Sequence, residues 1–263
     1  MSLAHRAVYP TQAEPLRQTL DALLADATAP QLDGGYLVAL VVPDSNRVAG
    51  GAAAADAYAA LQGLDITTAV VISPSHHGAF GRLSICQADA YTTPLGDVPV
   101  NDALRNELCD EDDDIFVDDT GHYHTEGADV QLPFLQRVLP DGFDAVPIVM
   151  GEESPAFCRE LGSAVGEVLY GKRAVVIGSA DVLAAESDEA LARLRAAIEG
   201  YQTSELMNLM GSEAVTVEGM GSVITTLLAA QARGANRARV LALDAPDAES
   251  GAPGRLACVF WRA

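Results

Sequence analysis

Three short runs of apolar residues constrain the fold of this chain more than any other feature. They are Tyr36 to Val42, Thr68 to Ser73 and Ala174 to Gly178, and the first two are followed directly by proline. Runs of this length without alternating polar residues are typical of parallel strands whose two faces are both buried. The chain is therefore predicted to contain a parallel sheet with helices packed on both sides.

The segments between these runs have the apolar spacing of helices. Residues 14–27, 51–61, 101–108, 156–170, 188–200, 204–210 and 220–233 are predicted helices, and 130–138 a helix interrupted by Pro133. Further strands are predicted at 83–85, 115–117, 143–150, 240–244 and 256–262, with an extended hairpin over 91–100. Because strands and helices alternate with no linker between them, we expect one α/β domain over residues 1–263, with a mostly parallel or mixed sheet.

The charge balance excludes one large class of function. The 263 residues carry 16 basic and 37 acidic side chains, a formal net charge of −21. Duplex nucleic acid is bound through a basic surface, which this composition does not supply. No apolar run is long enough to span a membrane and no signal pattern precedes the first helix, so we expect a cytoplasmic protein whose four cysteines are reduced.

Several polar side chains stand where an α/β sheet places its ligands, just beyond the carboxyl ends of strands. The first strand is followed by Asp44 and the second by His76 and His77, and Asp181 follows the strand over 174–178. Glu218 precedes a helix, and His122 and His124 lie in the loop before the helix over 130–138. Carboxylate and imidazole donors that meet at one point suit a first-row divalent metal.

Each of these side chains also has a purely structural interpretation. Asp44 and Asp181 are suited to turns and to bonds with nearby backbone, the histidine pair to a helix cap, and Glu218 to a solvated loop. The glycines at Gly219 and Gly221 follow no clear strand, and there is no phosphate-binding loop, so no nucleotide cofactor is expected.

Several blocks of sequence resemble the MEMO family, the group of AmmeMemoRadiSam system protein B. The blocks are Ser73-Pro74-Ser75-His76-His77, Thr93 to Val100, Asp129 to Leu135, Val146 to Val149 and Gly178 to Asp181, in family order over essentially the whole chain. The resemblance implies a fold similar to the catalytic subunit of class III extradiol ring-cleaving dioxygenases, which use non-haem Fe(II).

This chain departs from the family at several positions. The resemblance implies three metal ligands, which fall here on Asp44 in place of histidine, on the retained His76, and on Glu218 in place of cysteine. The family histidine a few residues after the Ser-x-Asp block is absent. An Asp–His–Glu set is harder and richer in oxygen than the family's own, and suits Fe(II), Mn(II), Zn(II) or Mg(II) better than soft ions.

These observations leave three hypotheses open. The first is a MEMO-like protein that binds a divalent metal, such as Fe(II), Zn(II) or Mn(II), through substituted ligands and has a divergent, oxidoreductase-like or hydrolytic activity. The second is a non-catalytic module that has lost the metal and binds a small molecule or peptide, its pocket closed by Arg47 pairing with acidic residues. The third is an extradiol dioxygenase, with His77, His122 or His124 as acid or base and Asp181 as a further catalytic candidate. The oligomeric state is left open, and a homodimer formed through an exposed edge or helix is one alternative.

Overall fold

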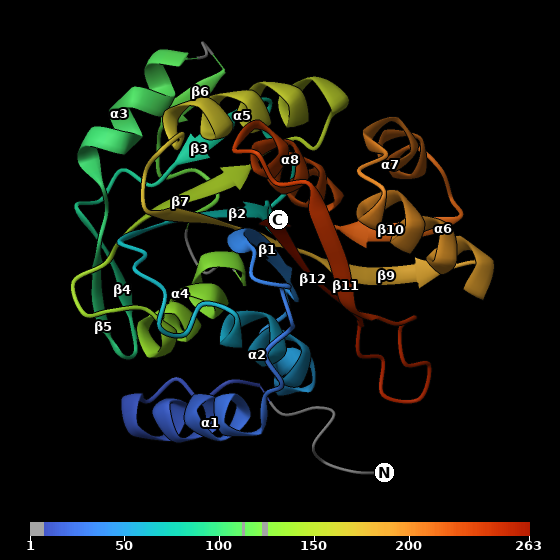
Figure 1. The fold of residues 1–263 in the computed structure, drawn as a ribbon, viewed down its shortest axis with the longest axis horizontal. Helices are drawn as coiled ribbons and strands as arrows, with labels where there is room; N and C mark the ends of the chain where they lie inside the picture. The colour runs from blue at the N-terminus through green and yellow to red at the C-terminus, as the bar shows by residue number, and fades with distance from the viewer. Residues whose placement is uncertain (1–7, 112–113, 123–125) are drawn as a thin grey trace.

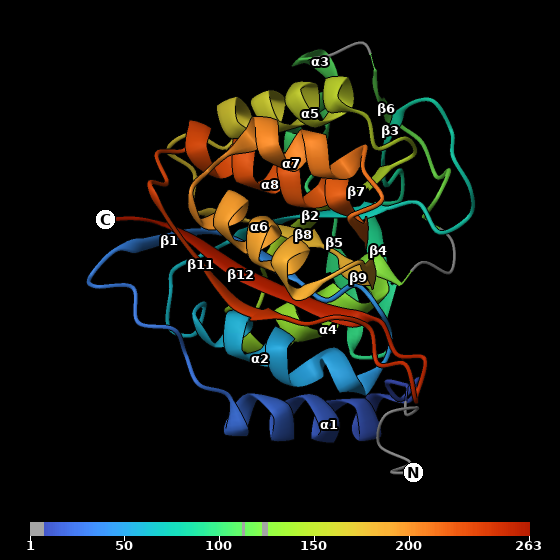
Figure 2. The same cartoon turned by 90° about the vertical axis from the view of Figure 1, so that its right-hand side faces the viewer.

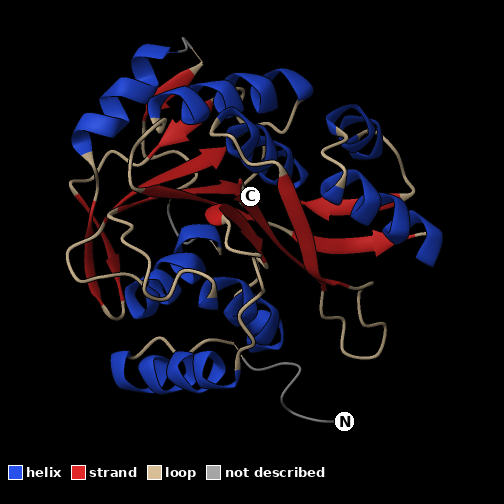
Figure 3. Cartoon of the chain, in the orientation of Figure 1, coloured by secondary structure: helices blue, strands red, loops and turns tan. Residues whose placement is uncertain are grey.

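A mixed sheet of ten strands runs through the middle of the molecule in the computed structural model, which describes residues 8–111, 114–122 and 126–263. The strands follow the order β10-β9-β12-β1-β8-β2-β7-β3-β6, with β11 paired to β12 (Figures 1 and 3). Their bounds are β1 (Tyr36–Val42), β2 (Thr68–Pro74), β3 (Leu83–Ile85), β6 (Ile115–Val117), β7 (Asp144–Met150), β8 (Ala174–Ser179), β9 (Asp181–Ala185), β10 (Val215–Glu218), β11 (Arg237–Leu243) and β12 (Gly254–Arg262). A separate hairpin pairs β4 (Ala90–Thr93) with β5 (Gly96–Pro99).

The centre of the sheet is parallel, as the apolar runs predicted. Strands β1, β8, β2 and β7 lie side by side with the same direction. Their carboxyl ends therefore reach the same edge of the sheet, and the loops that follow β1, β2 and β7 leave from that edge. The outer strands join this core through antiparallel pairs: β12 runs against β1, β9 against β12, β10 against β9, and β3 against β7.

Helices cover both faces of the sheet (Figure 2). On one face lie α5 (Pro155–Val168) and α8 (Met220–Ala232), with α3 (Asp102–Glu111) beside α5. On the other face lie α2 (Gly51–Ala59), which follows a short 3-10 turn, and α4 (Gly127–Val138), and α1 (Ala13–Asp26) packs outside them. The pair α6 (Asp188–Glu199) and α7 (Thr203–Met210) covers the β9–β10 end of the sheet.

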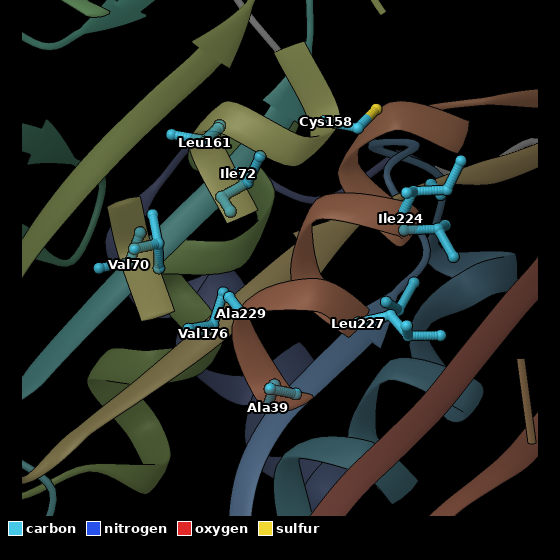
Figure 4. Packing of buried hydrophobic residues seen from close by; sticks show 14 of the residues in the cluster. Ala39, Val70, Ile72, Cys158, Leu161, Val176, Ile224, Leu227 and Ala229 are labelled. Atoms are coloured by element: carbon cyan, nitrogen blue, oxygen red, sulfur yellow. The ribbon is translucent and has the colours of Figure 1, made fainter. Parts of the chain in front are cut away.

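The apolar runs contain no alternating polar residues because each strand packs side chains into two hydrophobic cores, one on each face of the sheet. In β2, Val70 and Ile72 pack toward α5 and α8, while Ala69 and Val71 belong to the cluster under α2 and α4. Figure 4 shows the first cluster, in which strand residues meet Leu161 of α5 and helix α8. A polar residue at any of these positions would have to be buried. This explains why the apolar residues follow one another without interruption.

The fold class predicted from the sequence is confirmed, and three local predictions are wrong. Pro133 does not interrupt its helix, because α4 runs through it and buries the surrounding turns; tertiary packing outweighs the lost backbone hydrogen bond. Strands β9 and β10 were not predicted, since both are short and partly exposed, which weakens the apolar signal, and β10 lies at the edge of the sheet. A strand therefore does precede Gly219 and Gly221, contrary to expectation.

Two further expectations concern the cysteines and the membrane. Among the described residues none of the four cysteines forms a disulfide, and Cys86, Cys158 and Cys258 are buried. Within those same residues, every helix is too short or too polar to cross a bilayer.

Candidate metal centre

Three potential metal ligands meet at the carboxyl edge of the sheet. Asp44 follows β1, His76 follows β2, and Glu218 is the last residue of β10. One ligand atom from each of these side chains lies within 4.8 Å of the others. Asp44 and His76 were predicted to approach each other because both follow strands that end at this edge. Glu218 joins them because β10 runs beside β9, where it is paired with Asp181.

Asp44 lies at the centre of this group and is completely buried. Its Oδ2 atom is 2.5 Å from Nε2 of His76, and its Oδ1 accepts a hydrogen bond from the Ser179 hydroxyl at the end of β8. Helix α4 begins directly against this point: a Cβ on Gly127 would lie 2.3 Å from Cβ of Ser73. Both oxygens of the buried carboxylate are thus placed by neighbouring strands.

Asp181 fixes the loop that carries Asp44. Its two carboxylate oxygens accept hydrogen bonds from the backbone N–H groups of Asp44, at 3.2 Å, and Ser45, at 2.8 Å. Burial, and then the charge of Asp44, raise the pKa of Asp181 to about 7, although the two backbone bonds act in the opposite direction. In the sequence, Asp181 was a catalytic candidate that could equally bond backbone; the structure shows the backbone bonds, and a catalytic role stays a prediction.

Glu153 performs a similar function for Glu218. Its carboxylate accepts the N–H of Gly219 at 3.2 Å and that of Gly221 at 2.6 Å, so it caps the start of α8. Burial raises the pKa of Glu153, the two backbone bonds lower it, and the charges of Asp44 and Glu218 raise it further. Glu153 was not among the site residues predicted from the sequence. It follows β7 at the same sheet edge, so the strand-end rule applied consistently would have found it.

The charges in this group are unbalanced. Burial raises the pKa of Glu218, and the charges of Asp44 and Glu126 add to that rise while His76 opposes it. Burial lowers the pKa of His76, but its hydrogen bond to Asp44 and the surrounding carboxylates outweigh burial and leave the pKa raised. Nδ1 of His76 is buried and has no hydrogen-bond partner among the described residues. One imidazole therefore faces several acidic groups.

The group of three ligands found among the described residues does not include the other predicted histidines. His122 is 8% exposed, and its Nε2 lies 3.1 Å from the backbone carbonyl of Ser84; burial lowers its pKa. His77 is exposed, and its backbone N–H donates to the hydroxyl of Ser75. His124 lies outside the described residues. Their catalytic roles stay predictions.

Known proteins similar to this chain agree on one family. A family model described as Memo-like protein matches residues 2–252. The MEMO1 family protein of Sulfolobus acidocaldarius is 30% identical over 74% of this chain and 71% of its own length, and that of Thermoplasma acidophilum is 26% identical over 86% and 84%. A crystal structure of an uncharacterised Escherichia coli protein has the same fold, with a TM-score of 0.57 and 15% identity over 85% of this chain and 99% of its own. The chain belongs to the Memo-like protein family.

Proposed function

We propose that this protein binds one divalent metal ion through Asp44, His76 and Glu218 and uses the site for oxidoreductase-like chemistry on a small molecule. The observation that supports this most directly is the geometry: three ligand atoms from three separate segments of the chain lie within 4.8 Å of one another at the carboxyl edge of the sheet. Such sheet edges are where α/β proteins bind their ligands.

The residues present fit a divalent ion. Two carboxylates and one imidazole are donors that Fe(II), Mn(II) and Zn(II) accept, and no thiolate that would favour a softer ion is among them. The raised pKa values of Glu218, Glu153 and Asp181 show that their charged forms are disfavoured where they stand. A nearby dication stabilises those charged forms and so offsets the cost of burying them.

The chain's own residues hold this donor set in place. Ser179 donates to one oxygen of Asp44 and so directs the other toward His76. Asp181 anchors the loop of Asp44, and Glu153 anchors the turn of Glu218. A bound ion would supply a Lewis-acid centre for a substrate oxygen. Three protein ligands leave coordination positions for such a group.

Metal titration of the isolated protein tests this proposal. Chelator-treated protein is titrated with Mn(II), Zn(II) or anaerobic Fe(II) in a calorimeter, and the bound metal is counted by elemental analysis. One ion per chain is expected, with affinity at least tenfold weaker in Asp44→Asn and Glu218→Gln, and unchanged in Glu189→Gln, whose carboxylate is exposed on α6. Equal metal affinity in all four proteins, each shown to be folded by circular dichroism, would refute the site.

A second candidate function is a binding module without metal, and one observation favours it. Nε2 of His76 is already within hydrogen-bond distance of Asp44, so the pair satisfies itself without an ion. The expected closure by Arg47 is not seen, since Arg47 forms no ion pair with any described residue. Absence of metal binding in the titration, together with retained binding of a small molecule or peptide, would favour this function.

Extradiol ring cleavage is the third candidate and has its own test. It needs an acid or base beside the metal, and His77, His122 and His124 are the histidines left for this role. Formation of coloured ring-cleavage product from a catechol and Fe(II) would establish it.

We also place the protein in a reducing compartment such as the cytoplasm, which three buried cysteines without disulfides favour.

A further inference from the structure

A cavity of about 610 Å³ lies beside the candidate metal centre, between α1, α4 and the β4–β5 hairpin. Two residues connect it to the centre. Glu126 lines the cavity, and its charge acts on both His76 and Glu218; Asn46 also lines it, two residues after Asp44. The volume is in the range of cavities that bind small organic molecules.

The lining combines an apolar wall with acidic groups. The apolar side chains include Leu16 and Leu20 from α1 and Val130 and Pro133 from α4, and the acidic ones are Glu126 and Asp129. Among the described lining residues there is no lysine, arginine or histidine. The chain's one lysine, Lys172, pairs with Glu107, a residue of α3 on the other face of the sheet.

Charge therefore selects among small molecules. Moving an anion into this cavity brings it toward Glu126, Asp129 and the carboxylates of the metal centre without a described basic partner in the lining. Even with a dication held by Asp44 and Glu218, whose charges it neutralises, Glu126 keeps the surroundings negative. Asp129 accepts a hydrogen bond from the Tyr91 hydroxyl. Glu126 forms no ion pair with a described residue.

We propose that this cavity binds a small molecule with an apolar body and a protonated amine, the amine lying against Glu126 and the apolar body against α1 and α4. The inference rests on the proposed function in one respect: it makes this cavity the substrate side of the metal centre. It also assigns Glu126 as the residue that determines the preference for a positive charge. Carboxylates and phosphates of the same shape are excluded by repulsion.

Three probes that share one body test the charge preference in the wild-type protein. They are cyclohexylmethylamine, cyclohexylmethanol and cyclohexanecarboxylate, measured by calorimetry or ligand-observed NMR at pH 7 in the presence of a chelator. The amine is expected to bind at least tenfold more tightly than the alcohol, and the carboxylate more weakly than both. Equal affinities for amine and alcohol, or tighter binding of the carboxylate, would overturn the proposal.

Two matched variants then locate the binding. Glu126→Gln should remove most of the preference for the amine over the alcohol while leaving alcohol binding unchanged. Glu189→Gln makes the same charge change on α6 and should change neither affinity. An undiminished amine preference in Glu126→Gln would refute the assigned position.

Binding of the amine and binding of a metal ion are measured separately, so either can fail alone. Because the probes are measured without metal, amine binding by a protein that takes up no divalent ion would refute the proposed function and leave this inference standing. Metal binding without any preference for the amine would refute this inference and leave the proposed metal site standing.

Discussion

Adding one methyl group to the turn after Glu218 tests how this side chain is held in place. Gly219 joins β10 to α8 with φ of +81°, and a Cβ there would lie 2.3 Å from the carbonyl oxygen of Ser179. Gly63 is a matched control, since its φ is +76° and a Cβ would meet nothing within 4 Å. Gly219→Ala and Gly63→Ala therefore share the conformational penalty, and only the first adds a backbone clash.

The two contributions can be estimated separately. A left-handed conformation costs alanine about 1–2 kcal/mol, and the less flexible unfolded chain returns about 0.4–1 kcal/mol, so Gly63→Ala should lose about 1 kcal/mol. Forcing an extra carbon into a packed site costs about 1–3 kcal/mol more. Gly219→Ala should therefore lose about 2–4 kcal/mol of unfolding free energy.

Urea unfolding measures both variants, provided that their m-values match the wild type. Because the clash pushes the turn away from β8, Gly219→Ala should also weaken divalent-metal binding, while Gly63→Ala should leave it unchanged. Equal losses of stability in the two variants would show that the Ser179 contact is relaxed without cost. The account of how Glu218 is held would then be wrong.

Three further predictions concern buried polar groups. Burial and the charge of Asp44 raise the pKa of Asp181 to about 7, above the value of about 3.9 in an unfolded chain, so the folded state binds the extra proton between these values. In metal-free protein the unfolding free energy should fall as pH rises across that range, and urea titrations of Asp181→Asn should show a smaller fall. Glu153→Ala leaves two backbone N–H groups at the start of α8 without their acceptor, and thermal unfolding should show a loss of about 1–3 kcal/mol, with weaker metal binding. Tyr58→Phe removes the donor to Oε1 of buried Gln131 and should cost about 1–3 kcal/mol by urea unfolding without affecting metal affinity.

The sequence predicted the elements that are buried on both faces. The strands β1, β2, β7 and β8 were placed within one residue of their observed bounds, because a two-sided core permits no polar residue inside them. Strands β9 and β10 were missed for the opposite reason. In β10 apolar and polar residues alternate and Thr216 is exposed, and in β9 the apolar run covers only Val182 to Ala185, with Leu183 47% exposed.

The residues of the candidate site that follow buried parallel strands could be predicted from the sequence, and the others could not. Asp44 and His76 follow buried parallel strands, whose common direction places their carboxyl ends at one edge; their approach is a consequence of topology that a sequence can indicate. Glu218 reaches the same point through β10, an antiparallel edge strand, and was connected to the others only by family resemblance. Glu153 was overlooked because its neighbours along the chain carry no other signal of a site.

The electrostatic state of the centre depends on burial, which residue types alone do not specify. A cluster of carboxylates on a surface would be screened by water, and each would keep an ordinary pKa. Here Asp44 is fully buried and Glu153, Asp181 and Glu218 all have raised pKa values with burial as the first cause. Replacing the ligand carboxylates by amides should therefore have two separable effects. Asp44→Asn removes a buried charge beside Glu218 and should lower the pKa of that carboxyl, while the same change weakens the attraction for a dication. If the site serves mainly a structural role, Asp44→Asn should raise the free energy of unfolding and change no function. If the site binds a cation, the loss in the free energy of cation binding should exceed the gain in the free energy of unfolding.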